Sequence, residues 1–351
     1  MYISTMIKEN KNIYLYYWML TITVLVAIMI VVGGLTRLTD SGLSITRWDL
    51  FSGILPPITK EDWIFSFSLY KEIPEYKLIN SSMTLREFKV IFLWEYIHRL
   101  LGRIIGMFFL FPFIIFSINK FFNKKEFLSL LFIFILICFQ GFIGWYMVKS
   151  GLSERTDVSH YRLSFHLTFG FIIYILLFWN LLKLSNFSNH NNKEKFSGKL
   201  PYIFFILLLF QISLGALVSG LDAGKIYQSW PLMGLNYFPD DSLFEHIFSF
   251  KALESPSLVQ FFHRNLAYLI TVIFLIIFYN VLKNNNLYYL RRYLMFILFA
   301  LIAQIILGIF TILSGAHIFL ASLHQFGSIV LISLTIIFLF KNSKINLQLS
   351  S

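Results

Sequence analysis

Charged residues are scarce in this chain. Asp, Glu, Lys and Arg make up 13% of its 351 residues, about half the share found in a typical soluble domain. Hydrophobic residues make up 57% and include 41 Phe. This composition excludes an ordinary water-soluble globular enzyme. It indicates that most of the chain is embedded in an apolar environment.

Cysteine is nearly absent as well. The single residue of this type, Cys138, excludes both a disulfide within the chain and a metal cluster held by thiolates. Any metal ion bound by the protein must therefore be held by histidine or carboxylate side chains.

Long apolar runs, by contrast, recur along the whole chain. About 20 apolar residues are enough for a helix to cross a bilayer. The predicted fold class is therefore an all-α integral membrane protein with eight transmembrane helices. The first run is too long for a removable signal peptide, and it lacks the small-residue cleavage site. The eight runs lie near residues 13–34, 89–118, 127–148, 163–184, 201–221, 258–282, 293–314 and 320–340.

The net charge of +11 gathers on one side of these predicted helices. The two ends of the chain and the loops near 119–126, 185–200 and 283–292 carry many Lys and Arg but few acids. Positive residues mark the cytoplasmic face of membrane proteins, so both termini are expected in the cytoplasm. Because topology accounts for the excess charge, we expect no nucleic-acid partner.

The two halves of the sequence resemble each other. The segment GGLTRLTDSGLSITRW (33–48) aligns without a gap with GALVSGLDAGKIYQSW (215–230). EYIHRLLG then matches QFFHRNLA, and two further pairs of motifs match in the same order. Ordered matches of this kind indicate a duplication. We therefore predict two pseudo-symmetric four-helix bundles, residues 1–184 and 201–351, joined by a cytoplasmic linker at 185–200.

The long loops 34–88 and 222–257 lie on the opposite, outer side in this topology. Their aromatic, glycine and proline residues favour small caps at the membrane surface. Gly42 and Gly224 each follow an aspartate by two residues, which predicts tight turns.

Four of the eight histidines occupy equivalent places near the N-terminal ends of alternate spans, in the outer half of the bilayer. Each has a small residue one turn later on the same helix face, as a flat macrocycle standing on the histidine would require. Imidazole is a common axial ligand of haem, so we predict two bis-His haem centres, one in each half. The alternative is four buried histidines that only bond neighbouring helices. The histidines are His98, His166, His263 and His324, and the small residues are Gly102, Gly170, Ala267 and Gly327.

The other four histidines, and two arginines, receive simpler assignments. Arg99 and Arg264 directly follow two of the predicted ligands, and their guanidinium groups suit the propionates of a haem. Snorkelling of these arginines toward the interface is the alternative. The remaining histidines are expected in solvated loops: His160, His190, His246 and His317.

The halves differ at one informative place. Glu95 precedes His98 by three residues, whereas Gln260 stands at the same distance before His263. A carboxylate beside one site and a neutral amide beside the other suggest one reacting site and one that only binds. Glu95 is then a general base or proton relay; a structural ion pair with Arg99 is the alternative. Di-iron and zinc-protease sites would need further carboxylates or an H-E-x-x-H motif, which the sequence lacks.

Taken together, the motifs EYIHRLLGR, GWYMVKSGL, DVSHYRLSFHL, LDAGKIYQSWPLMG, VQFFHR and SLHQ resemble the haem A synthase family, in its alphaproteobacterial and mitochondrial branch. The resemblance covers essentially the whole chain. It implies an oxidoreductase that converts the C8 methyl group of haem O to a formyl group by successive hydroxylations. Water is the oxygen source, and the product, haem A, serves cytochrome oxidase. It further implies that His98 and His166 hold the substrate haem, that Glu95 serves the chemistry, and that His263 and His324 ligate a haem b cofactor.

The resemblance also implies a setting. Residues 1–184 would carry the substrate haem site and residues 201–351 the cofactor site, in a multi-pass protein of a bacterial inner membrane. Candidate partners are haem O synthase (the protohaem farnesyltransferase), cytochrome oxidase assembly factors and further copies of the chain. Two other functions stay open: a di-haem b electron-transfer cytochrome of the quinol-oxidising type, which has no use for Glu95, and a haem transporter.

Overall fold

The computed structural model describes residues 2–47, 55–152, 156–185 and 194–343. Within these ranges the chain forms α-helices and short 3-10 turns, with no β-strand. The helices are α1 (Tyr2–Leu38), α2 (Lys60–Tyr70), α3 (Pro74–Leu78), α4 (Leu85–Ile118), α5 (Lys124–Gly151), α6 (His160–Leu184), α7 (Leu200–Gly220), α8 (Pro256–Lys283), α9 (Tyr288–Leu313) and α10 (Ile318–Asn342). The 3-10 turns are η3 (Ala223–Lys225), η4 (Phe244–Phe248), η5 (Phe250–Glu254) and η6 (Asn285–Leu287).

Eight of these helices are long and apolar enough to cross a membrane: α1 and α4 to α10. The predicted fold class and the number of spans are therefore confirmed. Helix α4 begins at Leu85, ahead of its apolar run. Thr84 caps it, because its side chain accepts from the Glu87 backbone while the Glu87 carboxylate accepts from the Thr84 backbone.

The contacts within the chain divide it into two compact units. The first unit comprises residues 25–170, and the second comprises 1–24 together with 171–351. Helices α1 and α6 therefore contribute to both units. The predicted boundary at 185–200 and the pseudo-symmetry of two bundles stay predictions, and part of that linker lies outside the described residues.

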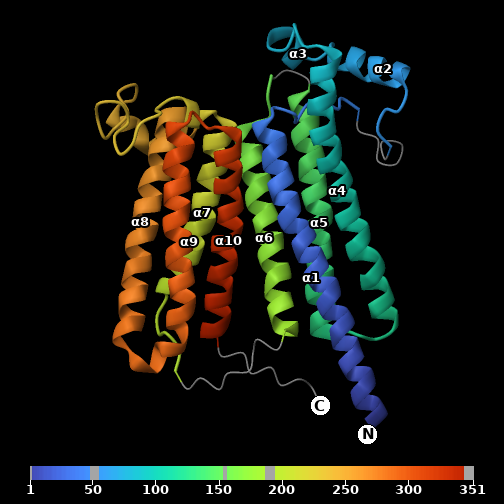
Figure 1. Cartoon of the computed structure of the whole chain (residues 1–351), viewed down its shortest axis with the longest axis vertical. Helices are drawn as coiled ribbons and strands as arrows, with labels where there is room; N and C mark the ends of the chain where they lie inside the picture. Colours follow the sequence, from blue (N-terminus) through green and yellow to red (C-terminus); the bar gives the residue numbers. More distant parts are fainter. Residues whose placement is uncertain (1, 48–54, 153–155, 186–193, 344–351) are drawn as a thin grey trace. The chain divides into compact units, whose positions relative to one another are not determined.

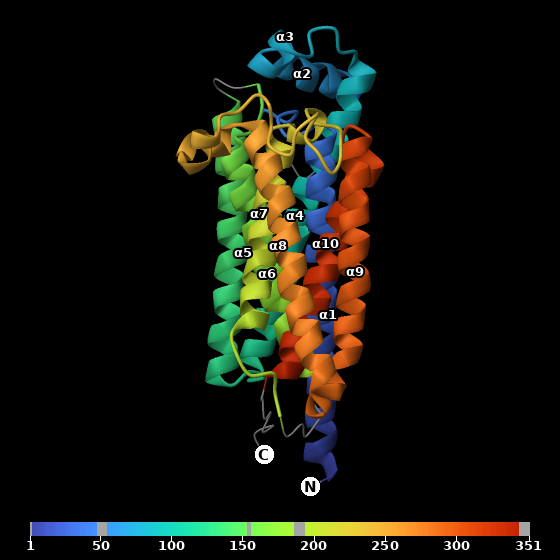
Figure 2. The ribbon, with the colours of Figure 1, turned by 90° about the vertical axis from the view of Figure 1, so that its left-hand side faces the viewer.

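The second unit contains a closed ring of four helices, drawn from yellow to red in Figure 1. Helix α7 packs on α8, α8 on α9, α9 on α10, and α10 again on α7. Fully buried apolar side chains such as Phe204, Phe274 and Ile336 fill the helix faces. The loop after α7 folds over the ends of α7 and α8, where η3 and η5 contact them (Figure 2).

The first unit carries a helical cap at one end of α4, formed by α2 and α3 (Figure 1). The aromatic rings of Phe67 and Tyr70 pack on Phe88, at 4.9 and 5.2 Å between ring centroids. Phe88 and Phe92, four residues apart, lie on one face of α4, so the same face that is buried under the cap continues toward Glu95. The expected small cap is therefore present, and it covers the segment that leads to the candidate site.

Tight turns follow α1 and α7, as the sequence predicts. The left-handed residue in each turn, however, is the aspartate and not the glycine: Asp40 has φ 48° and Asp222 has φ 51°. Aspartate tolerates this conformation because its short side chain can hydrogen-bond locally. Gly224 instead allows close packing, since a Cβ there would lie 3.3 Å from the Cβ of Ala316.

A buried carboxyl group makes the α2–α3 cap sensitive to pH. Glu75 is 5% exposed; its Oε1 accepts a long hydrogen bond from Asn80, at 3.4 Å, and its Oε2 finds no partner within the described part of the chain. Burial, with a smaller contribution from the Glu95 carboxylate, raises the pKa of Glu75 to about 8, although a hydrogen bond with Tyr70 opposes the shift. An unfolded glutamate ionises near pH 4.3, so the cap loses stability as the pH rises from about 4 to about 8.

We expect Glu75→Gln to remove this pH dependence. Hydrogen exchange in α2 and α3, corrected for the intrinsic rate, should speed up toward pH 8 in the wild type and stay constant in the variant. Glu72→Gln, at an exposed position three residues earlier, is the matched control and should behave as the wild type. Exchange that is independent of pH in the wild type would contradict this account.

Candidate functional site

The structure brings the four predicted histidines together in two pairs. In the first unit the ring centroids of His98 on α4 and His166 on α6 are 6.5 Å apart, with an interplanar angle of 73°. In the second unit His263 on α8 and His324 on α10 are also 6.5 Å apart, at 74°. The repeat in the sequence thus produces nearly the same side-chain geometry twice.

This spacing suits two imidazoles on opposite sides of one metal ion. A metal–nitrogen bond of about 2.0 Å, with each ring centre roughly 1.1 Å behind its nitrogen, places the two centres about 6 Å apart. The buried Nδ1 atoms of His166, His263 and His324 find no hydrogen-bond partner within the described part of the chain. The protein alone leaves these rings incompletely satisfied, so the residues present fit a bis-His haem in each unit.

Each histidine ring packs against a glycine of the preceding span. The Cβ of any other residue would lie 3.0 to 3.2 Å from the ring, which is tighter than ordinary contact. A larger residue at any of these positions would displace the ring by a few tenths of an ångström. The contacts are Gly33 with His98, Gly144 with His166, Gly215 with His263 and Gly308 with His324. The sequence signal of this contact is the recurrence of a glycine in the span before each of the four histidines.

The small residues one turn after the histidines were expected to leave open space for a macrocycle. Two of them instead contact glutamine side chains. Gly170 faces Gln140, and a Cβ at Gly327 would collide with the side chain of Gln304. The Gln140 amide donates to the backbone carbonyl of His166 at 2.9 Å. Gly170 therefore admits a glutamine that ties α6 to α5, and Gly327 admits the Gln304 side chain of α9 beside α10.

We expect Gly308→Ala to displace the His324 ring. Overpacking typically costs 1–3 kcal/mol, so the variant should retain roughly tenfold less haem in the second unit, measured as Soret absorbance per purified protein. Gly141→Ala is the matched control, because a Cβ at Gly141 meets no atom within 4 Å. Equal haem retention by both variants would show that the glycine contact does not position the ring.

Glu95 is held by donors on two sides and is 2% exposed. Its Oε2 accepts from the Ser44 hydroxyl at 2.7 Å and from the Ile45 backbone N–H at 2.8 Å. Its Oε1 accepts from Nη2 and Nε of Arg99, at 2.5 and 3.0 Å. Both oxygens of a carboxylate accept hydrogen bonds, so a carboxylate satisfies all of these donors. An amide would place its NH₂ group, itself a donor, next to the donors of either Ser44 and Ile45 or Arg99.

Gln260, the matching residue, meets the opposite environment. Its Nε2 donates to the carbonyls of Ala223 and Tyr227, at 2.8 and 3.4 Å, while its Oε1 accepts from Arg264 at 2.9 Å. The loop after α1 therefore presents donors, and the loop after α7 presents acceptors. Each half is built for the residue it carries, and only the first half is built for a carboxylate.

The two candidate propionate partners are bound to neighbouring loops. Nη1 and Nη2 of Arg99 donate to the carbonyls of Arg47 and Ile45, at 3.2 and 2.9 Å. Arg264 is 7% exposed and donates to the carbonyl of Tyr227 at 3.1 Å. Their contact with a haem stays a prediction. The ion pair of Glu95 with Arg99, which was the alternative to a catalytic role for Glu95, is present in the first unit.

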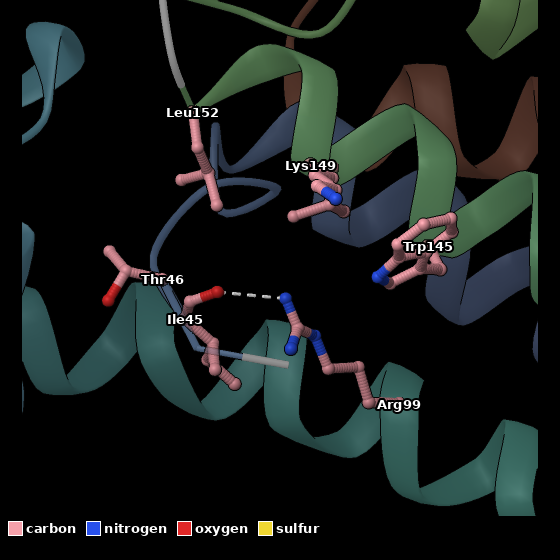
Figure 3. Close-up of a pocket in the computed structure, with 7 residues that line it drawn as sticks. Ile45, Thr46, Arg99, Trp145, Lys149 and Leu152 are labelled. Atoms are coloured by element: carbon pink, nitrogen blue, oxygen red, sulfur yellow. Dashed lines mark hydrogen bonds between the residues drawn. The ribbon is translucent and has the colours of Figure 1, made fainter. Parts of the chain in front are cut away.

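A pocket of about 230 Å³ opens beside the Arg99 side chain. Figure 3 shows the Arg99 guanidinium bonded to the Ile45 carbonyl, with Lys149 and Trp145 of α5 across the space. Thr46, Val148 and Leu152 complete the lining. The pocket thus lies between the loop after α1, α4 and α5, all within the first unit.

The remaining histidines are assigned as follows. His317 before α10 and His246 in η4 are exposed, as expected. His160 is half-buried at the beginning of α6, so its assignment to a solvated loop was wrong; the helix starts earlier than the apolar run. His190 lies outside the described residues. Within the described ranges, no group of three or more His, Cys, Asp or Glu side chains is placed to hold a metal ion.

Comparison with known proteins identifies the family of the chain. The family model of a cytochrome oxidase assembly protein matches residues 16–336. The chain is 48% identical to the haem A synthase of Pelagibacter ubique (strain HTCC1062), over 96% of this chain and 98% of that one. It is 44% identical to the haem A synthase of Rickettsia bellii (strain OSU 85-389), over 91% and 95% of the two chains. It is 41% identical to that of Rickettsia prowazekii (strain Madrid E), over 93% and 98%. The chain therefore belongs to the haem A synthase family of cytochrome oxidase assembly proteins.

Proposed function

We propose that this protein is a haem A synthase, an oxidoreductase that converts the C8 methyl group of haem O to a formyl group. Each conversion consumes one water molecule and releases four electrons and four protons. The observation that carries the proposal is the contrast between two histidine pairs of the same geometry and the unlike residues beside them, Glu95 and Gln260. Membership of the family supports the choice of substrate.

The substrate haem O is assigned to His98 and His166, and the haem b cofactor to His263 and His324. Haem b, when bound, supplies a one-electron redox centre in the half that lacks the carboxylate. Glu95 lies one helical turn before His98, and its bonds to Ser44 and Ile45 fix the orientation of its carboxylate. We assign to it the transfer of the protons that the oxidation releases.

The location of the protein is inferred from its bacterial relatives, and its topology from the distribution of positive charge. We place the protein in a bacterial inner membrane with both termini in the cytoplasm. Haem O synthase would deliver the substrate, and cytochrome oxidase assembly factors would receive the product. Association of several copies of the chain is compatible with this arrangement.

The haem content of the purified protein tests the proposal against the di-haem cytochrome. When the chain is expressed together with a haem O synthase, we expect one haem b per chain and a second haem that is haem O, an oxidised intermediate or haem A. Chromatography and mass spectrometry identify the extracted haems. Two molecules of haem b per chain, with haem O present in the membrane, would favour the electron-transfer cytochrome.

A further inference from the structure

The pocket beside Arg99 is lined by two positively charged side chains, the Arg99 guanidinium and the Lys149 ammonium group (Figure 3). The charge of Arg99 is matched by Glu95, to which it is bonded directly. Lys149 therefore supplies the net positive charge of the pocket. Its Nζ lies 4.9 Å from the centroid of the Trp145 ring, which forms part of the same wall.

The pocket is a neighbour of the His98–His166 pair along both helices that form it. Arg99 directly follows His98 on α4. Trp145 directly follows Gly144 on α5, the glycine that contacts the His166 ring. A flat ligand held by the two histidines would therefore lie close enough for a flexible carboxylate arm to enter the pocket.

The second half lacks the same feature. The motif Gln140-x-x-x-Gly144 of the first half matches Gln304-x-x-x-Gly308 of the second, which places Ile309 opposite Trp145 and Leu313 opposite Lys149. The two arginines do not differ in this way, because the side chains of Arg99 and Arg264 are both nearly buried and both donate to backbone carbonyls. The cationic pocket is thus found in the half that carries Glu95. If Lys149 only anchored the helix at the membrane surface, its presence in this half alone would be unexplained.

We propose that this pocket is a carboxylate subsite in which Lys149, with the edge of Arg99, binds one propionate of the substrate haem. The inference rests on the proposed function, because it assumes that His98 and His166 hold the substrate. A pocket of about 230 Å³ has room for a propionate arm and accompanying water. A substrate must enter and leave the site, so it can be bound by an exposed cation such as Lys149. A cofactor that stays in place can instead be held by a buried arginine such as Arg264.

The subsite has a defined kinetic consequence. Haem O and haem A carry the same propionates, so Lys149 stabilises substrate and product alike. Loss of its charge should therefore weaken haem binding and raise KM, while kcat stays near the wild-type value.

Titration with two porphyrins tests the subsite without relying on activity. Ferric protoporphyrin IX and its dimethyl ester, which lacks free carboxylates, are added to detergent-solubilised protein that already holds haem b in its second half. Binding to the first half is followed by the Soret band. Unchanged retention of haem b in each variant shows that it has folded.

We expect the wild type to bind the free acid more tightly than the ester, and Lys149→Gln to lose roughly three- to tenfold in affinity for the free acid only. Lys149→Arg should restore the preference. Lys89→Gln is the matched control, because the Lys89 Nζ also lies 4.9 Å from a tryptophan ring, that of Trp63, but outside the pocket. A full preference for the free acid in Lys149→Gln would overturn the subsite and leave the pocket to another anion, such as a lipid phosphate.

The subsite and the proposed function can fail separately. Haem A formation with an unchanged KM in Lys149→Gln would reject the subsite alone. Loss of the free-acid preference in Lys149→Gln, from a protein that never forms haem A, would support a carboxylate subsite and reject the synthase.

Discussion

Glu95→Gln should stop the formation of haem A while both histidine pairs still bind haem. General acid–base groups contribute about 10²- to 10⁴-fold to rate, so the product should fall to trace amounts. Haem binding should persist because the amide can still accept from Ser44 and Ile45 through its oxygen. Co-expression with a haem O synthase, followed by haem extraction and a Soret spectrum of the purified protein, measures both properties.

Two further variants separate chemistry from structure in this prediction. Glu95→Asp keeps a carboxylate and should retain part of the activity. If Glu95 serves only as the ion-pair partner of Arg99, then Glu95→Gln should release the loop around Ile45 and lose haem and product together. Full haem A production by Glu95→Gln would contradict a catalytic role outright.

Removal of one histidine from each pair should distinguish substrate from cofactor. His324→Ala should lose the retained haem b and, with it, haem A production. His166→Ala should keep haem b at the wild-type level but hold no second haem and form no product. Either loss should be nearly complete, because a single remaining imidazole leaves one axial position of a bis-His haem unfilled. Pyridine haemochrome assays and haem extraction quantify each haem per chain.

His317→Ala is the control for these variants, since His317 is exposed just before the first residue of α10. It should behave as the wild type in both assays. Loss of haem b from His166→Ala, with haem b retained in His324→Ala, would reverse the assignment of the two halves. It would also move the chemistry away from Glu95.

The spans and the equivalent positions of the four candidate histidines could be predicted from the sequence because both rest on local patterns. Long apolar runs identify helices, and the duplication places His98 and His263 at equivalent positions without any knowledge of packing. The pairing of His98 with His166 needed the fold, since 68 residues separate them. The same holds for the contact of each ring with a glycine of the preceding span, because spacing alone does not reveal which helix faces meet.

The surroundings of Glu95 could not be predicted for a related reason. Its partners Ser44 and Ile45 lie in a loop about 50 residues away, and the backbone N–H of Ile45 carries no sequence signal at all. The sequence predicted a small cap from the loop 34–88 but not the helices α2 and α3 within it, because these helices are short. Lys149 resembles an ordinary interfacial lysine until the pocket beside Arg99 is seen.

The most direct test of the account is the conversion itself. The chain is expressed with a haem O synthase in a bacterial host that makes no haem A, and the membrane haems are extracted and identified by chromatography and mass. We predict haem A, absent from the vector control and from the Glu95→Gln variant. Haem O that accumulates unconverted beside a purified protein carrying only haem b would contradict the proposed function and return Glu95 to a structural role.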